Sequence, residues 1–201
     1  MTRSPLTPMA EAGRVIAGAA RGIRLEGAPA GTRPLSDRVK QALFASLESE
    51  GAFSGGFLDL FAGIGAAGLE ALSRGATSAT FVERNATAIA LIESNLRRTG
   101  LSGANIVRGD VLRYLSAGRP AAQAPFAASV VDPPYVDLLL TPTLELLGDA
   151  RHRWLAAGAV VVGKHFWRDA PAPRIGGLIL DRQRRFGETM LSFYRQTGDQ
   201  T

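Results

Sequence analysis

The stretch Asp59-Leu60-Phe61-Ala62-Gly63-Ile64-Gly65-Ala66-Ala67-Gly68 decides the fold that we predict for this chain. An apolar run over 57–61 leads into it, and a helical pattern over 66–74 follows it as far as Gly75. Its glycines have the G-x-G-x-x-G spacing of a loop in which the backbone turns sharply and approaches a ligand closely. A glycine-rich turn needed only for close packing would give the same spacing. The stretch therefore predicts a strand, a tight loop and a helix in direct succession.

Strands and helices continue to alternate on both sides of this loop. The predicted strands cover 79–82, 105–108, 129–131 and 159–162, and the predicted helices cover 38–48, 87–99 and 137–147. Strands separated by helical segments indicate a parallel sheet with helices on its faces. The final alternating runs, 178–184 and 190–195, predict an antiparallel hairpin that places a reversed strand at or near one edge.

The N-terminal residues form a separate pattern. Residues 1–12 have no periodicity and contain two prolines, which indicates a flexible tail. Two short predicted strands, 14–18 and 21–25, flank a glycine-containing turn. We expect a tail over 1–12, a β-hairpin extension over 13–35 and an α/β domain over 36–201.

The composition fits one domain with a small appendage. Of the 201 residues, 46% are hydrophobic and 20% are charged, as in globular proteins with a sizeable core. The chain has no cysteine, which excludes a disulfide scaffold, thiolate metal ligands and a cysteine nucleophile. The first residues lack the apolar core of a signal peptide, and no apolar run approaches the roughly 18 residues of a membrane helix. We expect a soluble cytoplasmic protein.

The net charge of +5 is unevenly distributed along the chain. Residues 1–50 carry +2, residues 51–150 carry −2 and residues 151–201 carry +5. A mildly acidic middle between basic ends favours an acidic partner that is held by the ends. Arginine makes up 21 of the 23 basic residues, which suits phosphate binding, although a GC-rich genome would produce the same bias.

Acidic residues follow the first three strands of the predicted sheet. Ligands of such sheets bind beyond the carboxyl ends of the strands. Glu83 ends the second strand, 24 residues after Asp59, and could accept hydrogen bonds from both hydroxyls of a ribose. Asp110 follows the third strand and could accept an adenine amine or cap a helix. These positions predict an adenosine-containing cofactor, and Asp59 could supply the anion that a methionine ammonium prefers.

The segment Asp132-Pro133-Pro134-Tyr135 follows the fourth strand. Its prolines fix two backbone angles and remove two N–H donors, so that carbonyls and the Asp132 carboxylate are presented as acceptors. Tyr135 offers a flat face on which a nucleobase can stack. Two acceptors would orient a base amine, whose lone pair is delocalised, toward an electrophilic methyl group. The segment favours S-adenosylmethionine-dependent methylation of an amine, against the alternative of a rigid loop that merely ends a strand.

With these residues in view, the chain resembles the RsmD family of bacterial 16S ribosomal RNA guanine-N2 methyltransferases. The segments that carry the resemblance are Arg14–Gly18, Arg21-Gly22, Thr32–Val39, Asp59–Ala76 and Asp132–Tyr135. The resemblance implies a Rossmann-like class I methyltransferase, with a mostly parallel seven-stranded sheet, an antiparallel C-terminal hairpin strand and an N-terminal hairpin extension. It implies S-adenosylmethionine as cofactor, S-adenosylhomocysteine as product and a 16S rRNA guanine of the guanine-966 type as target.

The resemblance also assigns roles to individual residues. The expected catalytic residues, which would hold the flipped base, are Asp132, Pro133, Pro134 and Tyr135. The expected cofactor-binding residues are Asp59, Phe61, Gly63 and Gly65 toward the methionine end, Glu83 at the ribose and Asp110 at the adenine. No metal is expected.

Three departures from the family pattern stand out. Ile64 replaces a small polar residue, Ala67 replaces a leucine, and Lys164-His165 follow the fifth strand where the family often has a glutamate. We expect Lys164 and His165 at a solvated strand end, with contact to phosphate as the alternative. We do not expect His165 to act as a general base, because no carboxylate is paired with it in the sequence.

RNA binding is expected at the N-terminal extension, where basic residues gather within 27 positions. They are Arg14, Arg21, Arg24, Arg33 and Arg38, together with Lys40. The expected partner is 16S rRNA or the small ribosomal subunit, bound by a monomer. The alternatives are an adenine-N6 or cytosine-N4 methyltransferase, an NAD-binding oxidoreductase and a catalytically silent binding module.

Overall fold

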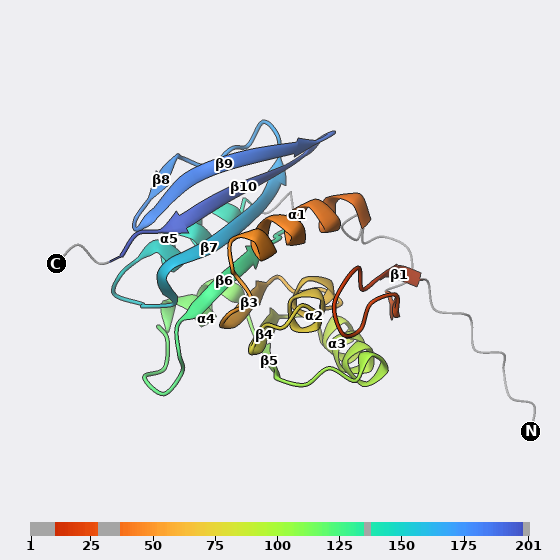
Figure 1. Ribbon diagram of the computed structural model, residues 1–201. Helices are drawn as coiled ribbons and strands as arrows, with labels where there is room; N and C mark the ends of the chain where they lie inside the picture. The colour runs from red at the N-terminus through yellow and green to blue at the C-terminus, as the bar shows by residue number, and fades with distance from the viewer. Residues whose placement is uncertain (1–10, 28–36, 135–137, 199–201) are drawn as a thin grey trace, which may run out of the picture.

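Strand β3 (Gly56–Leu60) lies at the centre of the fold, in a mixed sheet with helices on both faces (Figure 1). The computed structural model describes residues 11–27, 37–134 and 138–198. The helices are α1 (Asp37–Ser49), α2 (Ala66–Ser73), α3 (Ala86–Thr99), α4 (Val111–Ser116) and α5 (Leu140–Gly148). The other strands are β1 (Glu11–Arg14), β2 (Arg24–Glu26), β4 (Ser78–Glu83), β5 (Ala104–Arg108), β6 (Phe126–Val131), β7 (Leu155–Phe166), β8 (Arg174–Ile175), β9 (Leu178–Phe186) and β10 (Thr189–Gln196).

The described strands of the large sheet lie in the order β5-β4-β3-β6-β7-β10-β9-β8. The first five strands in this order, from β5 to β7, are parallel to one another. Strand β10 is antiparallel to both of its neighbours, β7 and β9. The chain moves outward from β3 to β4 and β5, and then returns to the opposite side of β3 as β6. The carboxyl ends of β3 and β6 therefore flank the point where the strand order reverses, the usual ligand position in such sheets.

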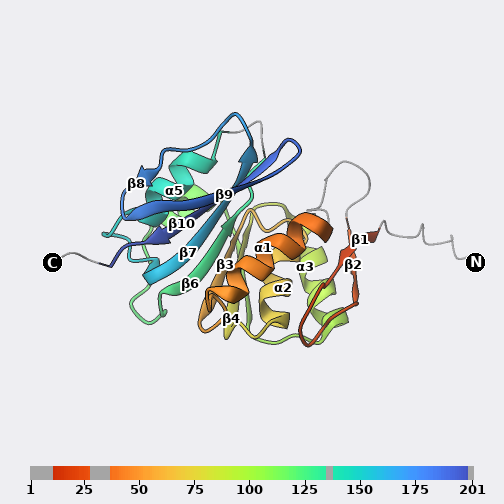
Figure 2. The same cartoon turned by 45° about the horizontal axis from the view of Figure 1, so that its top comes forward.

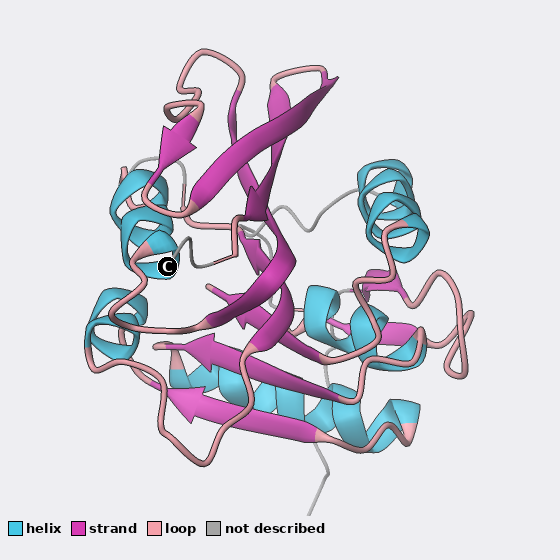
Figure 3. Cartoon of the chain, turned by 60° about the vertical axis from the view of Figure 1, so that its left-hand side comes forward, coloured by secondary structure: helices cyan, strands magenta, loops and turns pink. Residues whose placement is uncertain are grey.

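Helices lie on both faces of the sheet (Figure 3), and two hydrophobic clusters fill the space between the sheet and these helices. One cluster lies under α1, α2 and α3 and includes Phe44, Leu69 and Ile92. The other lies under α4 and α5 and is anchored by Trp154, whose indole Nε1 donates a hydrogen bond to the Leu115 carbonyl at 2.9 Å. Because both faces of the central strands are buried, their sequences read as continuous apolar runs.

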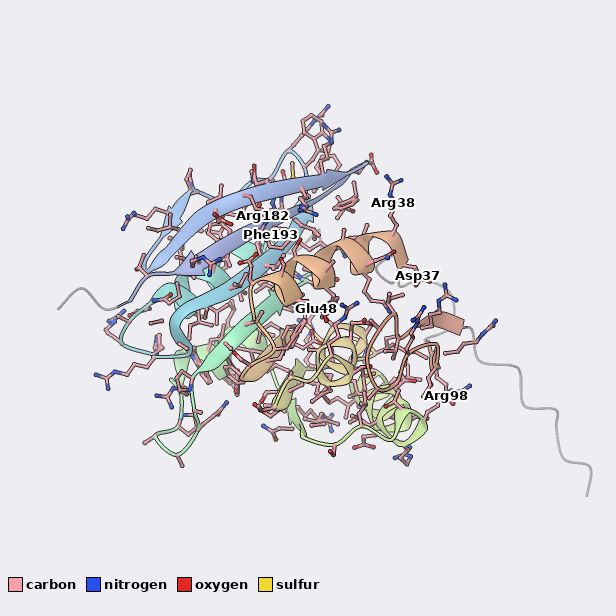
Figure 4. The ribbon with its side chains drawn as sticks, viewed as in Figure 1. Asp37, Arg38, Glu48, Arg98, Arg182 and Phe193 are labelled. Atoms are coloured by element: carbon pink, nitrogen blue, oxygen red, sulfur yellow. The ribbon has the colours of Figure 1, made fainter. Side chains whose placement is uncertain are left out.

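The C-terminal hairpin is fastened to the end of α1. Figure 4 shows Arg182 and Phe193 together on this hairpin, and the Arg182 guanidinium lies 4.4 Å from the centre of the Phe193 ring. Arg182 also pairs with Glu50, which directly follows α1. Arg195 pairs with the second oxygen of the same carboxylate. These contacts hold β9 and β10 against α1, so the basic C-terminal strands belong to the body of the fold.

The N-terminal strands β1 and β2 form a separate antiparallel pair beside α3 (Figure 2). The connection between them is tied to α2 by hydrogen bonds from the amides of Ile16 and Ala17 to the Glu70 carboxylate, at 2.7 and 3.0 Å. Lys40 is 2% exposed and donates to the Arg14 carbonyl, with Glu70 4.0 Å away. Lys40 is therefore a structural residue, and the expectation that it belongs to an RNA-binding set is wrong.

The structure departs from the predicted elements in several places. Strand β1 begins at Glu11, inside the expected tail, and residues 15–23 form a loop held by α2 in place of two strand segments. Helix α4 and strand β8 were not predicted, because elements of six and two residues are too short to show a period. Strand β8 adds an eighth member to the expected sheet. Helix α5 begins at Leu140, later than expected, with Pro142 in its first turn where proline is tolerated.

The mixed sheet with its antiparallel C-terminal hairpin confirms the predicted fold class. Within the described part of the chain, the helices are all too short or too polar to span a bilayer.

Candidate functional site

The candidate site begins with the buried carboxylate at the end of β3. Asp59 is 2% exposed, and its Oδ2 accepts a hydrogen bond from the Gly68 amide at 2.8 Å. Burial raises the pKa of Asp59 well above its ordinary value; the Gly68 hydrogen bond opposes this rise, and the nearby charges of Asp132 and Glu83 add to it. Three carboxyl groups, those of Asp59, Glu83 and Asp132, therefore lie close enough around the loop that follows β3 for their charges to interact.

The glycines of this loop have different tasks. A Cβ at Gly68 would lie 2.2 Å from the Phe81 ring, so Gly68 is required for helix–sheet packing. Gly65 is the N-cap of α2 with a φ of +81°, and a Cβ there would lie 3.2 Å from both Ile92 and Phe81. Gly63 has a φ of +55°, but a Cβ there would meet no atom within 4 Å. Gly68 thus has the packing role that the spacing allowed, and the close approach of a ligand at Gly63 stays a prediction.

Phe61 is held in an unusual backbone conformation at the start of the loop. Its φ of +61° is in the left-handed region, which residues other than glycine rarely adopt. Its ring is partly buried against the cluster under α4 and α5. Strained residues gather at ligand sites, where the surrounding structure fixes them. Ile64 is partly buried against the opposite cluster, so its bulk contributes to the core.

Glu83 closes the loop from the neighbouring strand β4. Its Oε2 accepts a hydrogen bond from the Gly63 amide at 2.8 Å, and its Oε1 accepts one from the Asn85 amide at 2.8 Å. Asp110 lies at the end of β5, where it caps α4 by accepting a bond from the Arg113 amide at 3.0 Å. The structure thus shows the capping role that the sequence left open for Asp110, and its role toward adenine stays a prediction.

Asp132 lies at the end of β6, on the other side of β3. Its Oδ1 accepts a hydrogen bond from Lys164 Nζ at 2.6 Å. Burial raises the pKa of the Asp132 carboxyl, and the Lys164 ammonium opposes that rise. Pro133 is buried and Pro134 is exposed, whereas Tyr135 lies outside the described residues.

The expectation that Lys164 and His165 lie at a solvated strand end is wrong. The Lys164 side chain is 13% exposed and pairs with Asp132, because strand β7 extends beyond its predicted end at residue 162. His165 is 4% exposed, and its ring nitrogens contact the Ser192 hydroxyl and the Phe166 carbonyl, each at 2.7 Å. Burial lowers the pKa of His165. The expectation that His165 does not act as a general base stays a prediction.

The charges around the loop distinguish between the cofactors that the sequence allowed. The amides of Gly63 and Gly68 already donate hydrogen bonds to carboxylates, whereas a dinucleotide pyrophosphate needs such amides for itself. A sulfonium with an ammonium group is attracted by the same acids. Among the described residues, no cluster of histidine and carboxylate side chains could hold a metal ion.

The predicted RNA-binding arginines lie on the N-terminal pair of strands and on α1. Arg14, Arg21, Arg24 and Arg38 are exposed, and Arg33 lies outside the described residues. Arg14 Nε is 3.3 Å from Asp37 Oδ2. Figure 4 shows Arg38 at the N-terminal end of α1, pointing away from the helix. The structure therefore leaves these four arginines on the surface.

Comparison with known proteins identifies the family. The family model described as Conserved hypothetical protein 95 matches residues 13–195. The chain belongs to this family, the RsmD family of methyltransferases. The match includes every candidate site residue of this RsmD-family protein.

Relatives of this RsmD-family chain cover most of its length. YlbH of Bacillus subtilis is 35% identical over 92% of this chain and 100% of its own. Ribosomal RNA small subunit methyltransferase D of Escherichia coli K12 is 36% identical over 74% of this chain and 72% of its own. The solved structure of yhhF from Escherichia coli superposes with a TM-score of 0.78 at 31% identity, covering 92% of this chain and 98% of that one.

We predict that Asp59→Asn stabilises the protein at neutral pH. The raised pKa means that ionised Asp59 costs folding free energy, so the stability of the native protein falls as pH rises through the folded pKa. Asparagine cannot ionise but keeps an oxygen for the Gly68 amide. Thermal unfolding from pH 3 to 8 should show a higher melting temperature for the variant at pH 7, and this difference should disappear as the pH falls below the ordinary pKa of an aspartate.

Asp149→Asn is the matched control for this measurement. Arg151 lowers the pKa of Asp149 to about 2, so its ionised form adds stability that is lost as pH falls through that value. This variant should therefore lose stability at pH 7 and approach the native protein in acid. An Asp59→Asn protein that is no more stable than the native one at pH 7, or whose gain does not depend on pH, would contradict the assignment.

Proposed function

We propose that the protein is an S-adenosylmethionine-dependent methyltransferase that modifies the exocyclic N2 amine of a guanine in 16S rRNA, of the guanine-966 type. The observation that carries this proposal is the position of Asp132 and Pro133. They follow β6, the strand next to β3, and so lie beside the loop that follows β3, in which a Cβ at Gly63 would meet no atom within 4 Å. The names of the relatives, which include a ribosomal RNA small subunit methyltransferase, support an rRNA substrate.

The residues around the loop fit this cofactor. Glu83 would accept hydrogen bonds from the ribose hydroxyls with the lone pairs that Gly63 and Asn85 do not use. Asp59 would favour the methionine ammonium by its charge, and Asp110 would lie on the adenine side. The space at Gly63, with the left-handed backbone of Phe61 before it, allows the loop to come close to a bound molecule.

Catalysis would depend on positioning and on removal of one proton. Bound S-adenosylmethionine would supply a methyl group whose bond to the sulfonium breaks toward sulfur as the amine nitrogen bonds the carbon, which leaves S-adenosylhomocysteine. Asp132 would hold one amine proton and the Pro133 carbonyl the other, and Tyr135 would stack on the base. The nitrogen loses a proton as it gains the methyl group, and Asp132, whose pKa is raised by burial, would accept it and pass it to water.

The carboxylate of Asp132 favours guanine over the other amine-bearing bases. In guanine the N2 amine neighbours N1–H, so two adjacent donors face the two oxygens of one carboxylate. In adenine and cytosine the amine neighbours a ring nitrogen that is an acceptor, and the second carboxylate oxygen would repel it. The adenine-N6 and cytosine-N4 alternatives are therefore disfavoured. The NAD-dependent alternative is disfavoured by the acids around the loop.

The surface arginines would supply affinity for RNA. Contacts from Arg14, Arg21, Arg24, Arg33 and Arg38 to phosphates would hold the substrate without reading its sequence. The target guanine would leave its stack to reach Asp132, which costs least in a loop.

We predict that Asp132→Ala abolishes methyl transfer without preventing cofactor binding. Transfer of labelled methyl from S-adenosylmethionine to unmodified small ribosomal subunits should fall by at least about a hundredfold, since the amine loses its orienting acceptor. Affinity for S-adenosylmethionine, measured by calorimetry, should change by less than about threefold. Asp181→Ala, an exposed acid on β9, is the matched control and should retain full activity. Undiminished transfer by a folded Asp132→Ala protein would show that the catalytic assignment is wrong.

We also predict that removing Arg21 and Arg33 together weakens RNA binding and its dependence on salt. Two lost phosphate contacts should reduce the slope of log affinity against log salt by about 1.4–1.8. Filter binding to 16S rRNA across a salt series measures this slope. The control variant loses two exposed arginines elsewhere, Arg97 on α3 and Arg174 on β8, and should keep the native slope. Equal slopes for the two double variants would show that the N-terminal extension is not part of the RNA-binding surface.

A further inference from the structure

The ion pair between Asp132 and Lys164 is formed by the register of two neighbouring strands. Val131 on β6 lies opposite Gly163 on β7, and the next residue on each strand is a member of the pair. The two side chains are 26% and 13% exposed, and Nζ lies 2.6 Å from Oδ1. The catalytic carboxylate proposed above thus carries a cation on one of its oxygens.

Stability alone does not account for this pair. Removing two charges from water costs about as much free energy as their attraction returns, so a largely buried ion pair is weak evidence for stabilisation. An apolar side chain at position 164 of β7 would avoid the cost of burying a charge. The position of Lys164, in direct contact with the carboxylate that would hold the base, points to a function toward the substrate.

The pair presents a row of three polar groups that matches one base. In order, Asp132 Oδ2 and Oδ1 are acceptors, and Lys164 Nζ is a donor. The Watson–Crick edge of guanine presents the complementary row: the N2 amine and N1–H are donors, and O6 is an acceptor. A carboxylate oxygen has two lone pairs and can accept from Nζ and N1–H together.

We propose that Lys164 determines specificity for guanine by donating a hydrogen bond to O6 while it remains bonded to Asp132. This inference rests on the proposed methylation of guanine N2 and adds the residue that reads the far end of the same edge. Adenine and cytosine, placed with their amines on Oδ2, bring a ring acceptor against Oδ1. Neither then offers a guanine-like sequence of donor, donor and acceptor.

The test is a double-substitution cycle, in which the native protein and Lys164→Met are each measured on a base with O6 and on a base without it. Small subunits are reconstituted with 16S rRNA that carries either guanine or 2-aminopurine at the nucleotide mapped as the methylation site. 2-Aminopurine keeps the N2 amine but lacks both N1–H and O6. We expect Lys164→Met to lower kcat/KM for guanine about ten- to a hundredfold more than for 2-aminopurine, the size of a hydrogen bond to a charged group.

Controls separate specificity from a structural role. Lys164→Arg should restore part of the preference for guanine, because it keeps a cationic donor. Arg97→Met removes one exposed positive charge, and it should not change the ratio of kcat/KM for guanine to kcat/KM for 2-aminopurine. Thermal unfolding and affinity for S-adenosylmethionine should show that Lys164→Met is folded and binds cofactor.

The outcomes distinguish this inference from the proposed function. If Lys164→Met loses equal activity on both bases, Lys164 only positions Asp132 and the inference is wrong. The inference is also wrong if Lys164→Met methylates guanine as fast as the native protein does. If the native protein methylates neither base at N2 in subunits, the proposed function itself fails, and the inference fails with it.

Discussion

The hydrogen bond from the Gly68 amide to Asp59 is the constraint on which the rest of the site depends. It joins the end of the central strand β3 to the first turn of α2, and so fixes the path of the loop between them. That path brings the Gly63 amide to Glu83 on β4 and leaves open space beside Gly63. Because β3 lies between β4 and β6, the same loop has Glu83 at the end of one neighbouring strand and Asp132 after the other. One buried carboxylate therefore organises residues from three strands.

The electrostatics of the site oppose stability and favour function. Burial raises the pKa of Asp59 and of Asp132, so both acids are costly to ionise in the folded protein. A cationic cofactor would offset the first cost, and Lys164 partly offsets the second. This arrangement suits methyl transfer, in which the protein mainly positions an amine and accepts a proton. The −2 charge of residues 51–150 agrees with such a site, and the basic ends agree with an RNA partner.

Sequence reasoning predicted the parts that depend on local pattern. The apolar runs, the glycines at 63, 65 and 68 and the cap at Gly100 indicate β3, α2 and α3 because strand and helix periods and turn chemistry are local. The contact of Lys164 with Asp132 was missed because it spans 32 positions and depends on the register of β6 against β7, which shifts between Phe126 and Ala128. The role of Lys40 was missed for a related reason. A charged side chain looks solvated until the carbonyl and carboxylate that surround it are brought together.

The identity of the methylated nucleoside tests the central claim most directly. Unmodified small ribosomal subunits are incubated with the protein and S-adenosylmethionine, and the 16S rRNA is digested and analysed by mass spectrometry. A single new N2-methylguanosine, absent when Asp132 is replaced by alanine, is the predicted result. New N6-methyladenosine or N4-methylcytosine, or no methylated nucleoside from a protein that binds S-adenosylmethionine, would contradict the account.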